Sequence, residues 1–295
     1  MPMLQILPRG RLCLASYPTG WLVLFVCLMF ATSSVWAQTP IRIASLPLEN
    51  REATFRAFTP LTTHLQHALQ QPVEMVYLES NRKVVDALEQ GLIDIAMLGP
   101  LPYVAISERN ARIEPLVFFR ERTGEVRYRC VLVAFSGDDI TIAQLRGRRL
   151  ALTQPLSTCG YLGSDAILRQ QAGFGLQETY YQYLGDHEAA ALAVVAGRAD
   201  AAGVKDEFAY KFAPLGLVVI GQSDWVPAVG LFAHQGRLSR QQLEDIRQVL
   251  LATPAEVYQT WGHFMRFGMA RASDTDFDVL RAFGNLSEIP QEGVP

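Results

Sequence analysis

The feature that most constrains this chain is a local pattern that occurs twice, at residues 87–96 and 193–202. In each copy an amphipathic helix ends, a glycine follows and an apolar strand begins, with Gly-x-x-Asp-x-Ala in register. A glycine directly after a helix is the usual left-handed C-cap, and an apolar strand suits a sheet covered on both faces. The spacing is too long for a solenoid, whose period is roughly 20–50 residues. The pattern predicts two similar α/β lobes with a cleft between them.

The N-terminal segment is typical of an export signal. Arg9 and Arg11 precede the apolar residues 21–31, and small residues before Gln38 mark a cleavage site. This apolar segment is shorter than the roughly 20 residues needed to span a bilayer. We expect residues 1–37 to be a cleaved signal peptide and the mature chain to be soluble and exported.

The composition of the mature chain excludes some partners. The full chain has 26 Lys and Arg against 29 Asp and Glu, so removal of Arg9 and Arg11 leaves 24 against 29, a net charge of −5. No basic run is present, which argues against nucleic acid as a partner. The remaining cysteines, Cys130 and Cys159, are too few for a disulfide scaffold. They could form one disulfide or remain thiols.

Strand and helix patterns alternate along the mature chain, which predicts an α/β fold with mostly parallel sheets. No linker separates the two halves, so we expect hinge strands to join lobe 1 (residues 38–129 and 225–295) to lobe 2 (130–224). The expected strands cover residues 41–46, 73–78, 93–98, 126–135, 149–153, 179–184, 199–204, 217–220 and 226–233. The expected helices include residues 82–90, 159–172, 187–196 and a segment after Ser239.

Ligands of open α/β sheets bind beyond the carboxyl ends of strands, where helices begin. Ser157 and Thr158 lie between a predicted strand and a predicted helix, and their hydroxyls with the free backbone N–H groups could bind an anion. An ordinary Ser/Thr N-cap would explain the same residues. His187 opens another helix after a strand and could donate to an anion, or it could be a solvated histidine. Residues 99–103 also lie between a predicted strand and a predicted helix. Residues 205–207 follow the second repeated strand, and a surface turn is the simpler interpretation of them.

Four motifs in order resemble the periplasmic phosphonate-binding proteins of phosphate, phosphite and phosphonate ABC importers. They are Gly-x-x-Asp-x-Ala-x-x-Gly-Pro, Tyr-x-x-Val, Ser-Thr-x-Gly-Tyr, and His-Glu followed by a Gly-x-x-Asp strand. The resemblance covers nearly all of the mature chain. It implies a type II periplasmic binding protein fold and a small oxyanion bound in the interlobe cleft, delivered to an ABC permease, with no cofactor, metal or catalytic residue.

The resemblance also implies a set of ligand-binding residues. Ser157 and Thr158 would hold the phosphonate oxygens and His187 would close on them. Asp206 or Glu207 would occupy the position that contacts the organic substituent of the ligand. Tyr103 and Tyr128 would frame the pocket.

Cys130 and Cys159 replace residues that are commonly serine in that family. If paired, they would join a strand to a helix within lobe 2. If free, they are soft ligands suited to a metalloid species such as arsenite, or targets for a sulfur oxyanion. Cys159 is among the expected ligand-binding residues. This leaves an alternative function open: a sensory receptor of the same fold that signals to a histidine kinase. A nucleophilic Cys159 with His187 as base is disfavoured, because no third orienting group is evident.

Overall fold

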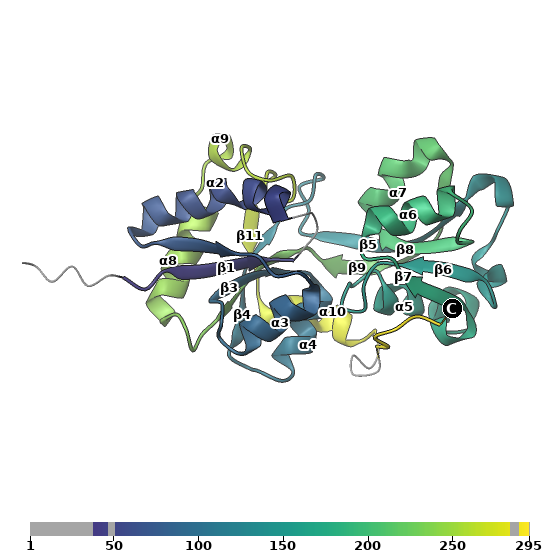
Figure 1. The fold of residues 1–295 in the computed structure, drawn as a ribbon, viewed down its shortest axis with the longest axis horizontal. Helices are drawn as coiled ribbons and strands as arrows, with labels where there is room; N and C mark the ends of the chain where they lie inside the picture. The colour runs from purple at the N-terminus through teal and green to yellow at the C-terminus, as the bar shows by residue number, and fades with distance from the viewer. Residues whose placement is uncertain (1–37, 47–50, 284–288, 295) are drawn as a thin grey trace, which may run out of the picture. The chain divides into compact units, whose positions relative to one another are not determined.

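Two separate β-sheets organise the chain (Figure 1). The computed structural model describes residues 38–46, 51–283 and 289–294. The predicted signal peptide, residues 1–37, lies outside this part. We call each sheet with its covering helices a lobe.

Lobe 1 is built on a six-stranded sheet of order β11-β4-β10-β3-β1-β2. Helices α2 (Arg51–Leu69) and α8 (Arg240–Leu251) lie on one face of this sheet, and α3 (Asn81–Glu89) and α4 (Pro100–Ser107) lie on the other (Figure 1). Ser239 caps α8 by accepting from the backbone N–H of Gln242, as its sequence predicts. The remaining elements are β1 (Ile41–Ser45), β2 (Val73–Val76), β3 (Ile95–Leu98), β4 (Ile113–Phe119), β10 (Gly230–His234), β11 (Met269–Arg271), α9 (Ala255–Tyr258) and α10 (Asp278–Arg281).

Lobe 2 is built on a five-stranded sheet of order β7-β6-β8-β5-β9. Helices α6 (His187–Val195) and α7 (Asp206–Phe212) lie on one face and α5 (Tyr161–Ala172) lies on the other (Figure 1). The strands are β5 (Arg127–Phe135), β6 (Arg149–Leu152), β7 (Tyr180–Tyr183), β8 (Ala201–Lys205) and β9 (Leu217–Pro227). Short 3-10 helices lie at Ser136–Asp138, Ile142–Leu145, Leu176–Glu178, Ala213–Leu215 and Asp274–Phe277.

The repeated sequence pattern makes the same contacts in both lobes. Its glycines, Gly91 and Gly197, both follow a helix with φ of +68°, as predicted. Its aspartates each accept a hydrogen bond from the backbone at the start of the neighbouring parallel strand: Asp94 from Arg42 N at 2.7 Å and Asp200 from Arg149 N at 2.8 Å. Each aspartate thus fixes the start of one strand against the next.

The sheets are mixed, which corrects the expectation of mostly parallel strands. The pairs β1–β2, β1–β3, β6–β7 and β6–β8 are parallel, whereas β4, β5, β9, β10 and β11 pair only antiparallel to their neighbours. The antiparallel pairs include the strands on either side of the points where the chain passes between lobes. A strand that enters a sheet from the other lobe has no helical crossover to make it parallel.

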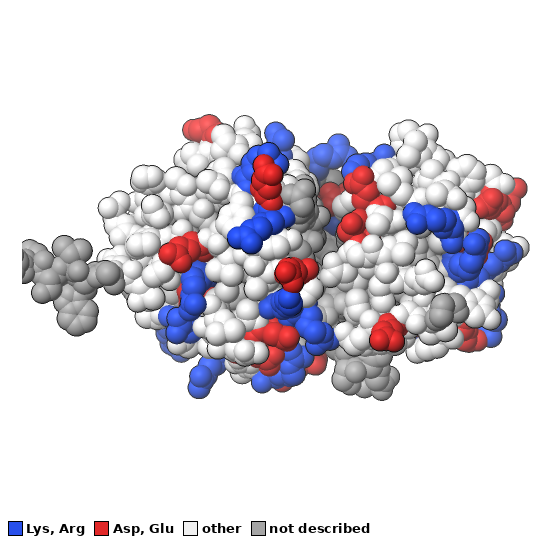
Figure 2. Space-filling view, viewed as in Figure 1, with Lys and Arg blue, Asp and Glu red and all other residues white. Residues whose placement is uncertain are grey.

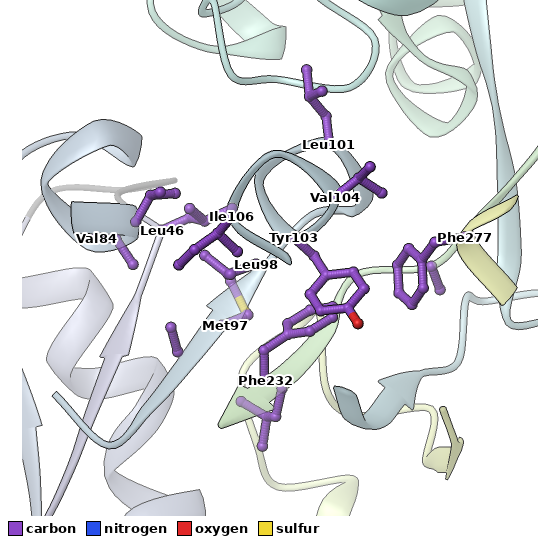
Figure 3. Close-up of a cluster of buried hydrophobic side chains, with 14 of the residues drawn as sticks. Leu46, Val84, Met97, Leu98, Leu101, Tyr103, Val104, Ile106, Phe232 and Phe277 are labelled. Atoms are coloured by element: carbon purple, nitrogen blue, oxygen red, sulfur yellow. The ribbon is translucent and has the colours of Figure 1, made fainter. Parts of the chain in front are cut away.

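The core of lobe 1 contains an aromatic group beside α4 (Figure 3). The ring of Tyr103 packs on Phe232 and Phe277, with centroids 4.6 and 4.4 Å apart.

On the face shown in Figure 2, basic and acidic side chains are interspersed over both lobes, in keeping with the small net charge. No helix of the described residues is long and apolar enough to cross a membrane.

Candidate functional site

A cavity of about 520 Å³ is lined by residues of both lobes. Lobe 1 contributes Asn81 and Pro102 among others, lobe 2 contributes residues at the ends of β6 and β8, and Tyr128 comes from β5. A second cavity of about 600 Å³ lies wholly in lobe 1 beside α4. Its charged lining residues are largely paired with one another, for example Arg247 with Glu114. The interlobe cavity is therefore the better candidate for a ligand site.

One wall of the cavity is the loop that leads from β6 into α5. It carries the hydroxyls of Ser157 and Thr158. The loop passes so close to itself that a Cβ on Gly160 would lie 2.7 Å from Gln154 O and from Thr153 Oγ1. The first N–H groups of a helix have no carbonyl partner within it, and the helix dipole adds positive charge there. This wall thus places the hydroxyls of Ser157 and Thr158 a few residues before the N-terminus of a twelve-residue helix.

The hydroxyl of Thr158 also connects the two lobes. Its Oγ1 accepts a hydrogen bond from the backbone N–H of Leu101, in the first turn of α4, at 3.1 Å. Tyr128 lines the same cavity from β5. Burial raises the pKa of Tyr128, so this phenol is neutral. Thr158 therefore links the β6–α5 loop of lobe 2 to α4 of lobe 1.

His187 enters the cavity as a neutral hydrogen-bond donor. Asp186 caps α6 by accepting from Ala189 N at 2.7 Å, which places His187 at the first position of the helix. Its Nδ1 accepts from Lys205 N at 3.2 Å, so the neutral ring carries its proton on Nε2. Burial and the charge of Lys205 lower the pKa of His187 to about 3. Phe208 stacks on the ring, with centroids 4.8 Å apart.

A buried cation lies next to His187 in the cavity wall. Lys205 is 7% exposed, and its Nζ lies 2.7 Å from Glu121 Oε2 and 3.0 Å from Glu207 Oε1. Burial opposes its charge, but the two carboxylates outweigh burial and raise the pKa of Lys205. Lys205 and Glu207 line the cavity, whereas Glu121 lies behind them.

The sequence interpretation missed two polar residues of the cavity. Thr153 and Asn81 are 1% and 6% exposed, and within the described residues Thr153 Oγ1 and Asn81 Oδ1 have no hydrogen-bond partner. A buried polar atom without a partner is costly, so such atoms often mark where a ligand or water binds. The signal was present in the sequence: Thr153 follows a strand, and Asn81 begins a helix after its cap, Ser80.

Residues 43–277 match the family model described as "ABC transporter, phosphonate, periplasmic substrate-binding protein". The chain belongs to this family. The resemblance inferred from four short motifs is thereby confirmed over most of the chain.

Individual relatives agree with this assignment. The phosphate-import protein PhnD of Mycolicibacterium smegmatis is 24% identical over 273 residues, covering 82% of this chain and 84% of PhnD. Among solved structures, PhnD1 of Prochlorococcus marinus in complex with methylphosphonate is similar with a TM-score of 0.71 and 14% identity, covering 83% of this chain and 96% of that one. A binding protein component of an ABC phosphonate transporter from Pseudomonas aeruginosa is similar with a TM-score of 0.68 and 18% identity, covering 83% of this chain and 85% of that one. At these identities the structural likeness shows the two-lobed type II fold.

Five of the predicted ligand-binding residues of this phosphonate-binding family member meet in the one cavity. They are Tyr128, Ser157, Thr158, His187 and Glu207. They come from β5, the β6–α5 loop, α6 and α7, which the two-lobed topology brings together.

Tyr103 and Asp206 do not line this cavity. The hydroxyl of Tyr103 donates to Asp274 Oδ1 at 2.6 Å on the far side of α4, and its ring is in the lobe 1 core. Asp206 Oδ2 accepts from the backbone N–H of Arg129 at 3.2 Å, so its carboxylate faces β5. In both cases packing by distant residues sets the side-chain direction, which local sequence does not reveal.

Cys130 and Cys159 form a disulfide. Both are fully buried, with exposures of 0% and 1%. This corrects the assignment of Cys159 as a ligand-binding residue, because its sulfur is bonded and lies outside the cavity lining. The disulfide joins the β6–α5 loop to β5. Cys159 therefore holds the loop that carries Ser157 and Thr158 in place and does not itself contact the cavity. Among the described residues no cluster of three or more His, Cys, Asp or Glu could hold a metal.

Proposed function

We propose that this chain is the periplasmic binding protein of an ABC importer and captures a small phosphorus oxyanion of the phosphonate, phosphite or phosphate type between its lobes. The observation that carries the proposal is the β6–α5 loop, where Ser157, Thr158 and buried Thr153 line the interlobe cavity shortly before helix α5 begins. Family membership supports the same ligand class.

The donors in this site are neutral and directional. The hydroxyls and His187 would bind the oxyanion oxygens, and both lysines of the cavity are engaged with carboxylates, Lys205 with Glu207 and Lys211 with Glu188. Neutral donors that are fixed before binding select an oxyanion by the positions of its oxygens. This mode of binding agrees with the small net negative charge of the mature chain.

The first test is calorimetric titration of the mature protein with methylphosphonate, phosphite, phosphate, a sulfonate and arsenite. We expect one or more phosphorus oxyanions to bind. Ser157→Ala should weaken that binding about tenfold or more, because a hydrogen bond to a charged group contributes roughly 1.5–3 kcal/mol. Ser136→Ala, at an exposed position of lobe 2, is the matched control. Failure of every phosphorus oxyanion to bind would overturn the proposal.

The sensory alternative has lost its main chemical argument. It relied on free thiols for a species such as arsenite, and both sulfurs are engaged in the disulfide. We infer capture and delivery rather than catalysis, with a permease as the membrane partner. Neighbouring genes that encode a permease and an ATPase would support this, whereas a kinase and response regulator would support the sensor.

We further propose that residues 1–37 are removed on export, that the mature chain is monomeric, and that the lobes divide at 129/130 and 224/225. These divisions fall within β5 and β9, which adjoin the crossings between the two sheets. N-terminal sequencing of the exported protein and its mass in solution test the first two points.

A further inference from the structure

The cavity contains a protein cation that occupies the carboxylates a cationic ligand group would need. Lys205 is at the end of β8, and its backbone N–H donates to His187, one of the proposed oxyanion donors. Its ammonium is therefore held in the same wall of the cavity as the proposed oxyanion site.

The ammonium of Lys205 is already engaged by groups of the protein. Two of its N–H directions are taken by Glu121 and Glu207 at 2.7 and 3.0 Å. The ring of Tyr128 lies 4.9 Å from Nζ and takes a third side through a cation–π contact. A lysine ammonium has three donors, and these three protein groups surround it.

The charge that faces the cavity is consequently close to zero at this point. The three groups together carry −1, from one lysine and two glutamates, but Glu121 lies behind the cavity lining. A ligand meets the pair Lys205–Glu207, which is neutral. A second ammonium placed here would share Glu207 with Lys205 and would be repelled by it at short range.

We propose that Lys205 is a specificity-determining residue that makes the cavity select oxyanions with a neutral substituent over those that carry an ammonium group. The inference rests on the proposed function, because it concerns the substituent of the oxyanion bound there. Apolar side chains, among them Pro102, Leu192 and Phe208, also line the cavity, so a neutral substituent has apolar groups to contact.

The test compares two ligands of nearly equal size, propylphosphonate and 2-aminoethylphosphonate, by calorimetry with the mature protein. We expect wild type to bind propylphosphonate at least about tenfold more tightly, which corresponds to about 1.4 kcal/mol. Lys205→Met frees Glu121 and Glu207 and should shift this ratio at least about tenfold toward 2-aminoethylphosphonate. Lys83→Met, on the exposed face of α3, is the matched control and should keep the wild-type ratio.

The outcomes separate this inference from the proposed function. If wild type binds neither phosphonate nor any other phosphorus oxyanion, the proposed function fails. If wild type binds 2-aminoethylphosphonate as tightly as propylphosphonate, or if folded Lys205→Met keeps the wild-type ratio, the role of Lys205 is overturned. Lys205→Met leaves two carboxylates unpaired and can fail to fold for that reason. The double variant Lys205→Met with Glu121→Gln retains only the carboxylate of Glu207, and its affinity ratio should also shift toward 2-aminoethylphosphonate. An unchanged ratio in that double variant would also overturn the role.

Discussion

His187 shows how the environment of one residue sets its chemistry. With Nδ1 engaged by Lys205 N, the ring can only donate through Nε2. A neutral donor binds an oxyanion without the cost of keeping a buried cation when the site is empty. The sequence alone does not distinguish this role from that of a solvated histidine, because Lys205 is 18 residues away in the chain.

Substitution of His187 tests the donor directly. His187→Asn keeps an acceptor near Lys205 N but removes the Nε2 donor, so we expect about a tenfold to hundredfold weaker oxyanion affinity with the fold retained. His187→Gln, whose amide can reach the Nε2 position, should recover part of the affinity. Calorimetry measures both, and equal affinity of His187→Asn and wild type would remove His187 from the site.

The same residue predicts a pH dependence of stability. The folded chain keeps His187 neutral with a pKa of about 3, whereas in the unfolded chain it protonates near its ordinary value of 6.5. Unfolding therefore takes up a proton below that pH, so this residue makes stability fall as the pH drops from about 7. Urea midpoints at pH 7.5 and 5.5 should differ more for wild type than for His187→Asn. His67→Asn, on the exposed side of α2, should behave like wild type, and identical pH dependence in all three proteins would contradict the prediction.

At the level of elements, the disulfide joins the binding loop to its supporting strand. Cys159 follows Thr158 in the β6–α5 loop, and Cys130 lies on β5 two residues from Tyr128. A Cβ on Gly163 would meet Cys130 Sγ at 2.8 Å, so the first turn of α5 packs tightly against this linkage. The bond thereby sets the position of the helix N-terminus relative to β5.

Removal of this bond should affect both stability and binding. Cys130 and Cys159 are 29 residues apart, and a loop of that size corresponds to about 3 kcal/mol of unfolding free energy. For Cys130→Ser with Cys159→Ser we expect that loss in urea unfolding and weaker oxyanion binding well below the unfolding transition. Wild type in reductant is the control for the substitutions. Wild-type affinity in the folded double variant would limit the disulfide to a stabilising role.

Most elements could be predicted from the sequence, and the exceptions have physical causes. The repeat placed helix ends at Gly91 and Gly197 because a glycine C-cap is a local signal. Strand β4 was missed because Glu114 and Pro115 interrupt its apolar pattern, and β11 is only three residues long. Helix α7 was missed because Lys205, Asp206 and Glu207 also suit a surface turn.

The site was predictable where its residues follow strands and open helices, and less so where distant parts of the chain meet. Ser157 and His187 occupy such local positions, and both line the cavity. The pairing of Lys205 with Glu121 spans 84 residues, and the contact of Thr158 with Leu101 spans 57. Only the folded topology brings those partners together.

At the level of the whole molecule, a C-terminal segment adds a link between the lobes. Val294 O accepts from Tyr181 N at 2.7 Å, and Pro290 O accepts from the hydroxyl of Tyr183 at 2.9 Å, so residues 289–294 lie along β7 of lobe 2. In the same segment Gln291 accepts a hydrogen bond from Arg82 on α3 of lobe 1. The lobes are thus held by this segment as well as by the chain crossings next to β5 and β9.

Removal of residues 289–295 should weaken ligand binding without altering the cavity, because none of residues 289–294, the described part of this segment, lines it. A link between lobes favours the arrangement in which both can contact the ligand, and its loss lowers the population of that arrangement. We expect about a two- to tenfold rise in the Kd for the oxyanion, and a larger radius of gyration in small-angle scattering of the ligand-free protein. Arg82→Ala removes only the contact with lobe 1, so it separates linkage of the lobes from support of β7. A smaller effect of Arg82→Ala in the same direction is expected, whereas an unchanged Kd in the truncated protein would show that the strands alone hold the lobes for binding.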